Sequence, residues 1–214
     1  MTIAARLHEV YSRMYDHLGP QHWWPGETPF EVMVGAILTQ NTSWKNVERA
    51  IDNLRGAGLL TFERLADLPT GLLAEYIRPA GYYNLKAGRL RNLLQYITDQ
   101  HQGDLDAFLG QNLAELRPQL LSVKGVGPET ADSILLYAAN LPIFVVDAYT
   151  HRILGRHGLI DEDADYHRIQ ELFMDHLESD APLYNEYHAL LVRIGNQYCK
   201  KTNPDCANCP LQGV

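Results

Sequence analysis

Hydrophobic residues recur along most of this chain at the three- and four-residue spacing of amphipathic helices, and no run shows the two-residue alternation of a strand. Residues 2–18 follow this spacing and stop at Gly19-Pro20, whereas residues 30–38 are almost continuously apolar, as in a buried helix. Ser43 is placed to cap the next helix, which extends to about Ala57. The remaining predicted helices cover residues 61–66, 71–77, 84–100, 105–109, 112–120, 128–139, 147–157, 164–179 and 183–198. The pattern therefore predicts an all-α protein with a loop-like tail from Cys199.

The length and composition are those of an ordinary globular chain. Its 214 residues, 46% hydrophobic and 21% charged, suffice for one domain or two small ones, and no linker or repeat separates the helices. The first residues lack the apolar core of a signal peptide, and the longest apolar run, 134–146, is too short to span a bilayer. We therefore expect an intracellular, cytoplasmic protein without a membrane partner.

The net charge of −8 argues against a protein that holds nucleic acid by bulk electrostatics. The basic residues are nevertheless grouped: the stretch 78–91 (RPAGYYNLKAGRLR) holds four of them and no acid, and a Lys200-Lys201 pair lies near the C-terminus. This grouping predicts an acidic body with a basic stripe. The alternative is that these side chains simply cover solvated helix faces.

The most informative motif is Leu121-Ser-Val-Lys-Gly-Val-Gly-Pro-Glu-Thr-Ala-Asp132. Gly125-x-Gly127 precedes a helix that begins near Pro128, so the turn presents bare backbone N–H groups at a helix N-terminus, where a phosphate binds readily. Asp147 follows the apolar segment PIFVV, and a carboxylate there is costly unless it is paired or used in chemistry. Asp147 is also placed to cap the following helix, a role compatible with catalysis.

These residues resemble the helix-hairpin-helix–Gly/Pro–Asp (HhH-GPD) signature of the endonuclease III superfamily of DNA glycosylases, with the family's spacing from Glu129 to Asp147 (147 − 129 = 18). The resemblance implies two helical lobes around a DNA cleft: a six-helix domain at 22–133, with the hairpin at about 112–139, and a second domain formed by 1–21 and 134–214. It implies that the Asp147 carboxylate stabilises positive charge at the sugar C1′ or activates the attacking water. The residues expected to contact the DNA backbone are Lys124, Gly125, Val126, Gly127 and Thr130.

Glu129 occupies the position at which bifunctional members of the family carry a lysine that attacks C1′ and forms a Schiff base. A glutamate cannot do this, so the resemblance implies a monofunctional glycosylase that uses water. Glu129 is then expected to position water or the sugar.

An aromatic cluster, Trp23-Trp24-Pro25 with Trp44, supplies the candidate base pocket. The bland interpretation is a core plug. Together with the segment 78–87, however, the cluster resembles the endonuclease III-related 3-methyladenine glycosylases, in which aromatic rings sandwich a flipped, cationic base. The same resemblance makes Gln40 and Asn41 candidates to fill the gap left by the extruded base, and Lys86 a DNA contact. Tyr82 and Tyr83 are expected to line the cleft or to pack.

The three cysteines, Cys199, Cys206 and Cys209, form the pattern C-x6-C-x2-C. This is similar to the iron–sulfur loop of the same family, which places a fourth cysteine at position 215, beyond Val214. We expect a [4Fe-4S] cluster whose fourth ligand is not in this sequence. A three-cysteine zinc or labile cluster site, with Asp205 or solvent as fourth ligand, and free thiols are the alternatives.

The sequence thus predicts a monomeric base-excision glycosylase that acts on double-stranded DNA and hydrolyses the glycosidic bond of alkylated purines such as 3-methyladenine. One alternative is a pyrimidine-lesion or mismatch glycosylase with weak lyase activity. The other is a hairpin module that binds DNA without catalysis.

Overall fold

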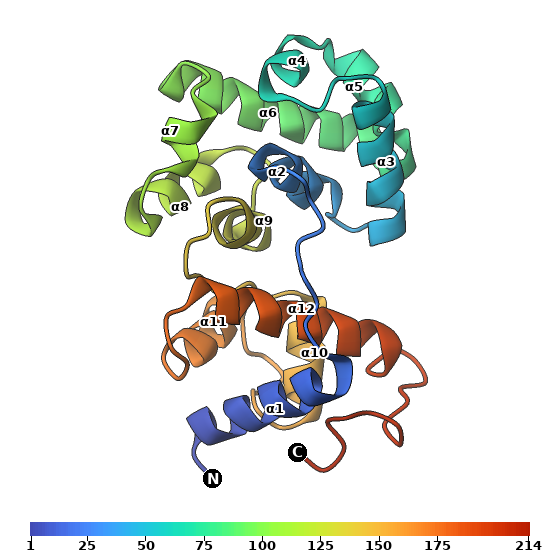
Figure 1. The fold of residues 1–214 in the computed structure, drawn as a ribbon, viewed down its shortest axis with the longest axis vertical. Helices are drawn as coiled ribbons and strands as arrows, with labels where there is room; N and C mark the ends of the chain where they lie inside the picture. Colours follow the sequence, from blue (N-terminus) through green and yellow to red (C-terminus); the bar gives the residue numbers. More distant parts are fainter. The chain divides into compact units, whose positions relative to one another are not determined.

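The structure is a computed structural model that describes all 214 residues, and it consists of helices and loops without a strand (Figure 1). This confirms the predicted all-α class. The elements are α1 (Ile3–Leu18), α2 (Pro29–Leu38), α3 (Trp44–Gly56), α4 (Phe62–Asp67), α5 (Thr70–Tyr76), the 3-10 turn η1 (Arg78–Ala80), α6 (Tyr83–His101), α7 (Leu105–Leu109), α8 (Leu113–Ser122), α9 (Pro128–Ser133), the π-helical segment η2 (Ile134–Ala138), α10 (Ala148–Arg156), α11 (Tyr166–Met174) and α12 (Ala181–Gln197).

The chain divides into two compact units. The central unit is Pro25–Leu141, and the terminal unit combines Met1–Trp24 with Pro142–Val214. The sequence analysis places the junctions earlier, at 21/22 and 133/134. The second difference has a structural reason: η2 continues the hairpin helix and packs against α2 and α8, so it belongs with the central unit.

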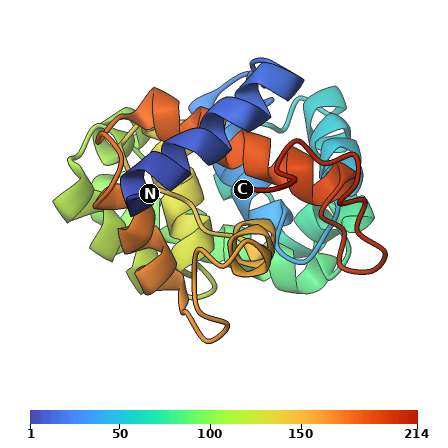
Figure 2. The same ribbon diagram turned by 90° about the horizontal axis from the view of Figure 1, so that it is seen from below.

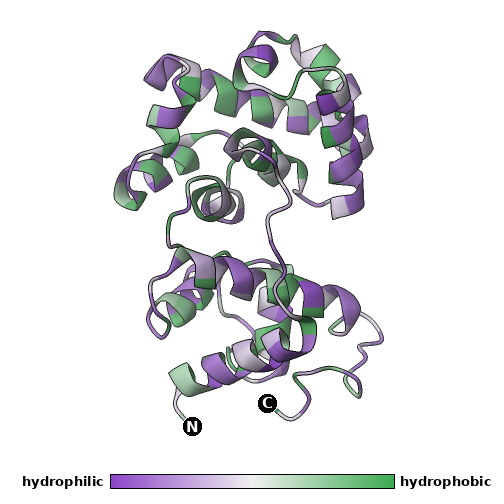
Figure 3. Cartoon of the chain, viewed as in Figure 1, coloured by the Kyte–Doolittle hydropathy of each residue, from purple (hydrophilic) through white to green (hydrophobic).

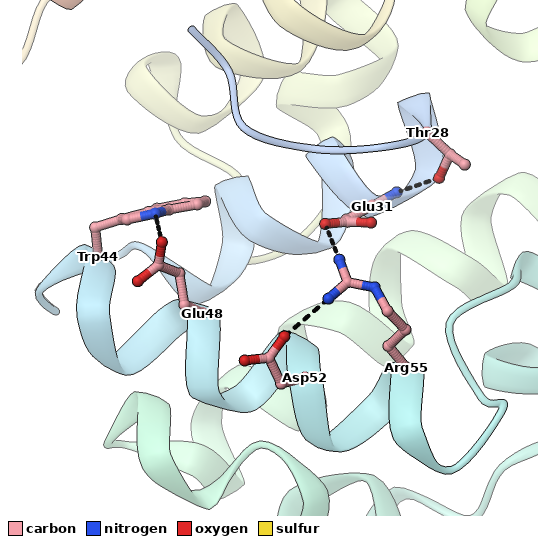
Figure 4. Close-up of polar contacts among 6 residues, drawn as sticks. All are labelled: Thr28, Glu31, Trp44, Glu48, Asp52 and Arg55. Atoms are coloured by element: carbon pink, nitrogen blue, oxygen red, sulfur yellow. Dashed lines mark hydrogen bonds and ion pairs between the residues drawn. The ribbon is translucent and has the colours of Figure 1, made fainter.

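Helix α2 is the core of the central unit, where α3, α6, α9 and η2 pack around it (Figure 1). All residues from Phe30 to Leu38 are buried, and the helix is correspondingly apolar on every side (Figure 3). Thr28 caps it by accepting a 3.1 Å hydrogen bond from the Glu31 backbone N–H. The buried Glu31 carboxylate in turn accepts a 2.7 Å hydrogen bond from Arg55, which ties the start of α2 to the end of α3 (Figure 4).

Helix α12 organises the terminal unit, with α1 alongside it and α10 packed against it (Figure 2). The core is aromatic: the rings of Phe144 and Phe173 stack with centroids 3.7 Å apart, and the Tyr187 hydroxyl donates to the Leu7 carbonyl of α1 at 3.0 Å. This packing fixes the segment that leads into Asp147.

The predicted helices differ from the observed ones by a few residues at their ends, and the largest difference is the end of α11, at Met174 rather than 179. Periodicity also cannot reveal the π-turn in η2, where the Ala139 N–H donates to the Ile134 carbonyl at 3.1 Å. No helix has the length and apolar character needed to cross a membrane.

Candidate active site and nucleic-acid interface

Asp147 is the N-cap of α10, with its backbone extended and its side chain only 12% exposed. Its Oδ1 accepts two hydrogen bonds from Thr150, one from the backbone N–H at 2.7 Å and one from the hydroxyl at 2.9 Å. The capping role considered from the sequence is therefore real. It occupies one carboxylate oxygen and leaves Oδ2 to other partners.

The second oxygen faces His188 of α12, whose Nε2 lies 3.6 Å from Oδ2. His188 is 5% exposed, and its ring meets the edge of Phe144. The sequence analysis did not single it out, because a lone histidine in the middle of a helix carries no local signal.

Close packing of α10 on α12 brings these two groups together. A Cβ at Gly195 would lie 2.2 Å from Cδ1 of Tyr149, so only glycine allows this approach. The Tyr149 hydroxyl donates to Asn196 at 2.7 Å, and Arg152 donates to the Cys199 carbonyl at 2.7 Å. Helix α10 is thus anchored to the C-terminal end of α12 and to the residues that follow it.

The surroundings of Asp147 favour its ionised form. Burial alone raises the pKa of the carboxyl group, but the nearby His188 imidazole, with the two Thr150 donors, outweighs it. The net result is a pKa below the ordinary value. The carboxylate is available as a base or as a stabiliser of positive charge.

The hairpin turn joins α8 to α9. Gly125 adopts φ +99°, and a Cβ there would lie 2.5 Å from Cγ of Arg89, so the arginine stem lies directly on the bare glycine backbone. Gly127 is the N-cap of α9 in extended backbone, and the first N–H groups of α9 have no partner within the helix. Lys124 is exposed at the entrance of the turn, whereas Val126 is buried beneath it.

Gln40, two residues after the end of α2, braces this turn. Its amide nitrogen donates to the Gly125 carbonyl at 3.1 Å and to the Thr130 hydroxyl at 2.9 Å, and its oxygen accepts from the Arg89 guanidinium. Gln40 and Thr130 thus hold the hairpin together, in addition to any contact with DNA. Asn41, next in sequence, is exposed with φ +53°.

The basic stretch 78–91 does not form the predicted stripe. Lys86 is 1% exposed, and its ammonium donates to the Leu38 and Ala80 carbonyls, both at 2.8 Å. Arg91 donates to three carbonyls at the C-terminal end of α4, and Arg89 is held by Gln40. The position of Lys86 is therefore structural and does not support a phosphate contact.

All three tryptophans are half-buried, two of them in the terminal unit and one in the central unit. Trp23 and Trp24 end the first segment of the terminal unit, with ring centroids 5.2 Å apart in an edge-to-face arrangement. Pro25 is exposed and opens the central unit. Trp44 is the first residue of α3, where its indole N–H donates to Glu48 at 2.8 Å, which fixes the ring on the helix (Figure 4).

Tyr82 is the aromatic side chain most available to a ligand. It precedes α6 in left-handed backbone, at φ +46°, and is 72% exposed. Neighbouring Tyr83 is half-buried and has the Arg78 guanidinium 5.6 Å from its ring centroid. Tyr83 is therefore packed against the protein, whereas Tyr82 lies in solvent.

Glu129 is exposed in the first turn of α9, and the buried side of that helix carries Asp132. Arg117 of α8 holds Asp132 with two hydrogen bonds, at 2.7 and 3.1 Å. This ion pair joins the two helices of the hairpin.

The cysteines lie in the C-terminal tail. Cys199 is buried and its Sγ accepts a 3.2 Å hydrogen bond from Arg156, whereas Cys206 is exposed and Cys209 is half-buried. The three thiols do not converge into a group able to hold a metal ion. Since the thiols as placed do not fit an iron–sulfur cluster, we derive no step of the chemistry through one.

Comparison with known proteins places this geometry in context. Residues 34–179 match the model of the "HhH-GPD superfamily base excision DNA repair protein" family. A Methanocaldococcus jannaschii protein, whose name gives DNA repair glycosylase as a provisional function, is 48% identical over 96% of this chain and 94% of its own. Endonuclease III of Sulfolobus acidocaldarius is 29% identical over 86% of this chain and 79% of its own.

Two solved structures are also similar. A 3-methyladenine DNA glycosylase of H. pylori, bound to 1,N6-ethenoadenine, has a TM-score of 0.78 and 31% identity over 92% of this chain and 98% of its own. An endonuclease III trapped covalently on DNA has a TM-score of 0.83 over 99% of this chain and 94% of its own; at 21% identity it shows the shared fold.

Proposed function

The chain belongs to the HhH-GPD superfamily of base-excision DNA repair proteins, and on that premise we propose that this DNA glycosylase hydrolyses the glycosidic bond of alkylated purines such as 3-methyladenine, with Asp147 as the catalytic carboxylate. The observation that carries the proposal is the buried, anionic Asp147 at the start of α10. Cleavage of an N-glycosidic bond builds positive charge on the sugar, and a preorganised carboxylate stabilises that charge or activates water.

The lability of the glycosidic bond in alkylated purines supports Asp147 as the catalytic carboxylate. A purine alkylated at N3 is cationic, so its bond to the sugar is already weakened and the departing base needs no proton donor. A single carboxylate is then sufficient, provided that the base is held. The similar H. pylori glycosylase, which binds 1,N6-ethenoadenine, supports a modified purine as the substrate class.

Glu129 supports hydrolysis rather than strand cleavage. Its carboxylate offers no amine for a Schiff base, and the nearby Lys124 lies at the turn entrance, five residues earlier. We therefore propose that the enzyme lacks AP lyase activity and that Glu129 positions water or the sugar.

The half-buried tryptophans are the candidates for stacking on the base. An indole face attracts a cationic base beyond ordinary stacking, which favours Trp23, Trp24 and Trp44, with Pro25 beside them. The hairpin, with Lys124 and the backbone of Gly125 to Gly127, is the candidate phosphate contact. The exposed Asn41 and Tyr82 are suited to contact bases around the lesion.

Although the thiols as placed do not converge, the spacing C-x6-C-x2-C leads us to propose that Cys199, Cys206 and Cys209 are structural ligands of an iron–sulfur cluster whose fourth ligand is not in this sequence. Iron and acid-labile sulfide in the purified protein, measured with and without cysteine-to-serine substitutions, test this. We further propose that the enzyme acts as a monomer on double-stranded DNA.

The deciding experiment measures release of methylated purines from DNA treated with dimethyl sulfate, by chromatography of the free bases. We expect Asp147→Asn to slow release by about 100-fold or more while DNA affinity is retained. Asp165→Asn is the matched control, because Asp165 caps α11 in the same way, accepting from the Arg168 backbone N–H at 2.9 Å. Release by Asp147→Asn at the unsubstituted rate would refute the proposal.

The relationship to endonuclease III favours one other candidate, a glycosylase for pyrimidine lesions with weak lyase activity. Borohydride reduction in the presence of abasic DNA discriminates between the two. Covalent capture of the protein on DNA would support this second candidate, whereas base release without capture supports hydrolysis.

A further inference from the structure

The catalytic candidate, Asp147, lies beside a buried histidine for which the sequence predicts no role. Asp147 Oδ1 is taken by the two Thr150 donors, so the direction of the carboxylate depends on what holds Oδ2. His188 Nε2, from the middle of α12, lies 3.6 Å from that oxygen. Both side chains lie within the terminal unit and are anchored by the tight contact of α10 with α12.

We infer that His188 is a positioning residue for catalysis: its imidazole holds Oδ2 of Asp147 and keeps the carboxylate charged and correctly directed among buried aromatic side chains. The inference rests on the proposed function, because it assigns His188 a role only if Asp147 performs the chemistry. His188 does not itself touch the substrate in this account.

The buried surroundings of the pair make such a partner necessary. The ring of Phe144 is nearly perpendicular to those of His188, Tyr184 and Tyr187, so aromatic side chains cover this side of the pair. A carboxylate beside such a wall is driven toward its neutral form unless a donor or a cation compensates. Thr150 compensates one oxygen with neutral donors, and His188 is the group that can supply both a hydrogen bond and a charge to the other.

The charged surroundings of His188 are simple. From α10 the titratable group that faces it is Asp147, and the segment before α10 presents the uncharged Phe144. On α12 itself Tyr184 and Tyr187 are buried, which raises the pKa of each phenol and keeps both neutral near pH 7. Asp147 is therefore the charged group that a substitution at His188 affects directly.

Removing the His188 imidazole should raise the pKa of Asp147. Burial raises the pKa of Asp147, and His188 is the first of the groups that oppose it. Without His188 the pKa of Asp147 must rise, so base release is lost at a higher pH as the solution is acidified. A histidine that only fills the core would alter stability and leave this acid limb where it is.

The test measures single-turnover base release from dimethyl sulfate-treated DNA between pH 5 and 8.5, with spontaneous release subtracted. We compare the unsubstituted protein with His188→Leu, which removes donor and charge, and His188→Gln, which keeps a donor near Nε2. For His188→Leu we expect about tenfold slower release at pH 7.5 through lost orientation, and a rate ratio between pH 5 and pH 7.5 at least about threefold lower. His188→Gln should recover most of the rate at pH 7.5 while its acid limb still lies at higher pH than in the unsubstituted protein.

Two further measurements keep the outcomes distinct. In an Asp147→Asn background, His188→Gln should have no additional effect on the residual rate, since the group on which it acts is gone. If His188→Leu does not fold, the acid limb of His188→Gln decides alone. An unshifted acid limb in a folded His188 variant, together with an inactive Asp147→Asn, overturns this inference and leaves the proposed function intact. Full activity of Asp147→Asn overturns the proposed function itself.

Discussion

Lys86→Met probes the least expected feature of the central unit, a lysine buried under α2. The Lys86 ammonium is 1% exposed and donates to the carbonyls of Leu38 and Ala80. Burial, with a smaller contribution from the positive charge of Arg89, lowers its pKa from the usual 10.5 to about 8. Methionine has a similar length and no charge, so the substitution removes the titration with little change in volume.

The magnitude follows from proton linkage. Between pH 8 and 10.5 the unfolded chain still holds the Lys86 proton while the folded protein has released it. The unfolded state therefore binds more protons in this window, and the free energy of unfolding rises with pH. At 1.36 kcal/mol for each pKa unit, Lys86 adds about 2.5 kcal/mol between pH 7 and pH 10.

Denaturant unfolding followed by circular dichroism, with the thiols kept reduced, measures this at pH 7, 8, 9 and 10. The stability of the unsubstituted protein relative to Lys86→Met should increase by about 2.5 kcal/mol across that range. Exposed Lys124→Met is the control for the loss of a lysine and should run parallel to the unsubstituted protein. A difference between unsubstituted protein and Lys86→Met that stays constant with pH refutes the reasoning.

Three further predictions concern the hairpin. Gly125→Ala should lower the free energy of unfolding by about 1 to 3 kcal/mol, because its φ of +99° and the Arg89 side chain, 2.5 Å from the position of a Cβ, exclude a larger residue. Gly127→Ala is the control and should fold normally, because the space around Gly127 is open. Thermal melts of the two variants measure the difference. Arg117→Met should lower the free energy of unfolding by up to about 5 kcal/mol, because it removes the cation that neutralises the fully buried Asp132 carboxylate. Asp132→Asn in the same chain should recover part of this loss in denaturant unfolding, and the absence of any recovery would contradict the argument from this ion pair. Lys124→Met should reduce the slope of log affinity for DNA against log salt by about 0.9, and an unchanged slope would show that Lys124 meets no phosphate.

Most of the helices could be predicted from the sequence because their information is local. The apolar spacing and the break at Gly19-Pro20 act within a few residues, so α1, α2 and α6 begin and end near the predicted positions. Ser43 lies at the predicted N-cap of α3, but its side chain makes no capping hydrogen bond. The junctions between the units depend instead on which helices pack together, and a continuous pattern from 128 to 139 contains no sign of the π-turn.

The residues of the candidate site likewise differ in whether local sequence or tertiary packing identifies them. Asp147 and the hairpin glycines could be found because each is recognised by its immediate neighbours in the chain. His188 could not, since its importance arises only when α12 lies against the start of α10. Lys86 was assigned to the wrong surroundings because a lysine beside other basic residues has the same local pattern whether it faces solvent or two carbonyls.

The internal hydrogen bonds of the basic stretch 78–91 change the expected basis of DNA binding. Its charges at Lys86, Arg89 and Arg91 are directed at main-chain carbonyls or at Gln40, so they stabilise the central unit and its hairpin. A chain of net charge −8 that uses these cations internally gains little from releasing counterions. We therefore propose that its hold on DNA depends on directed contacts, in which the backbone of the braced hairpin binds phosphate and aromatic side chains stack on an extruded base. On this proposal we expect weak binding to undamaged DNA, because a lesion that flips readily supplies much of the discrimination.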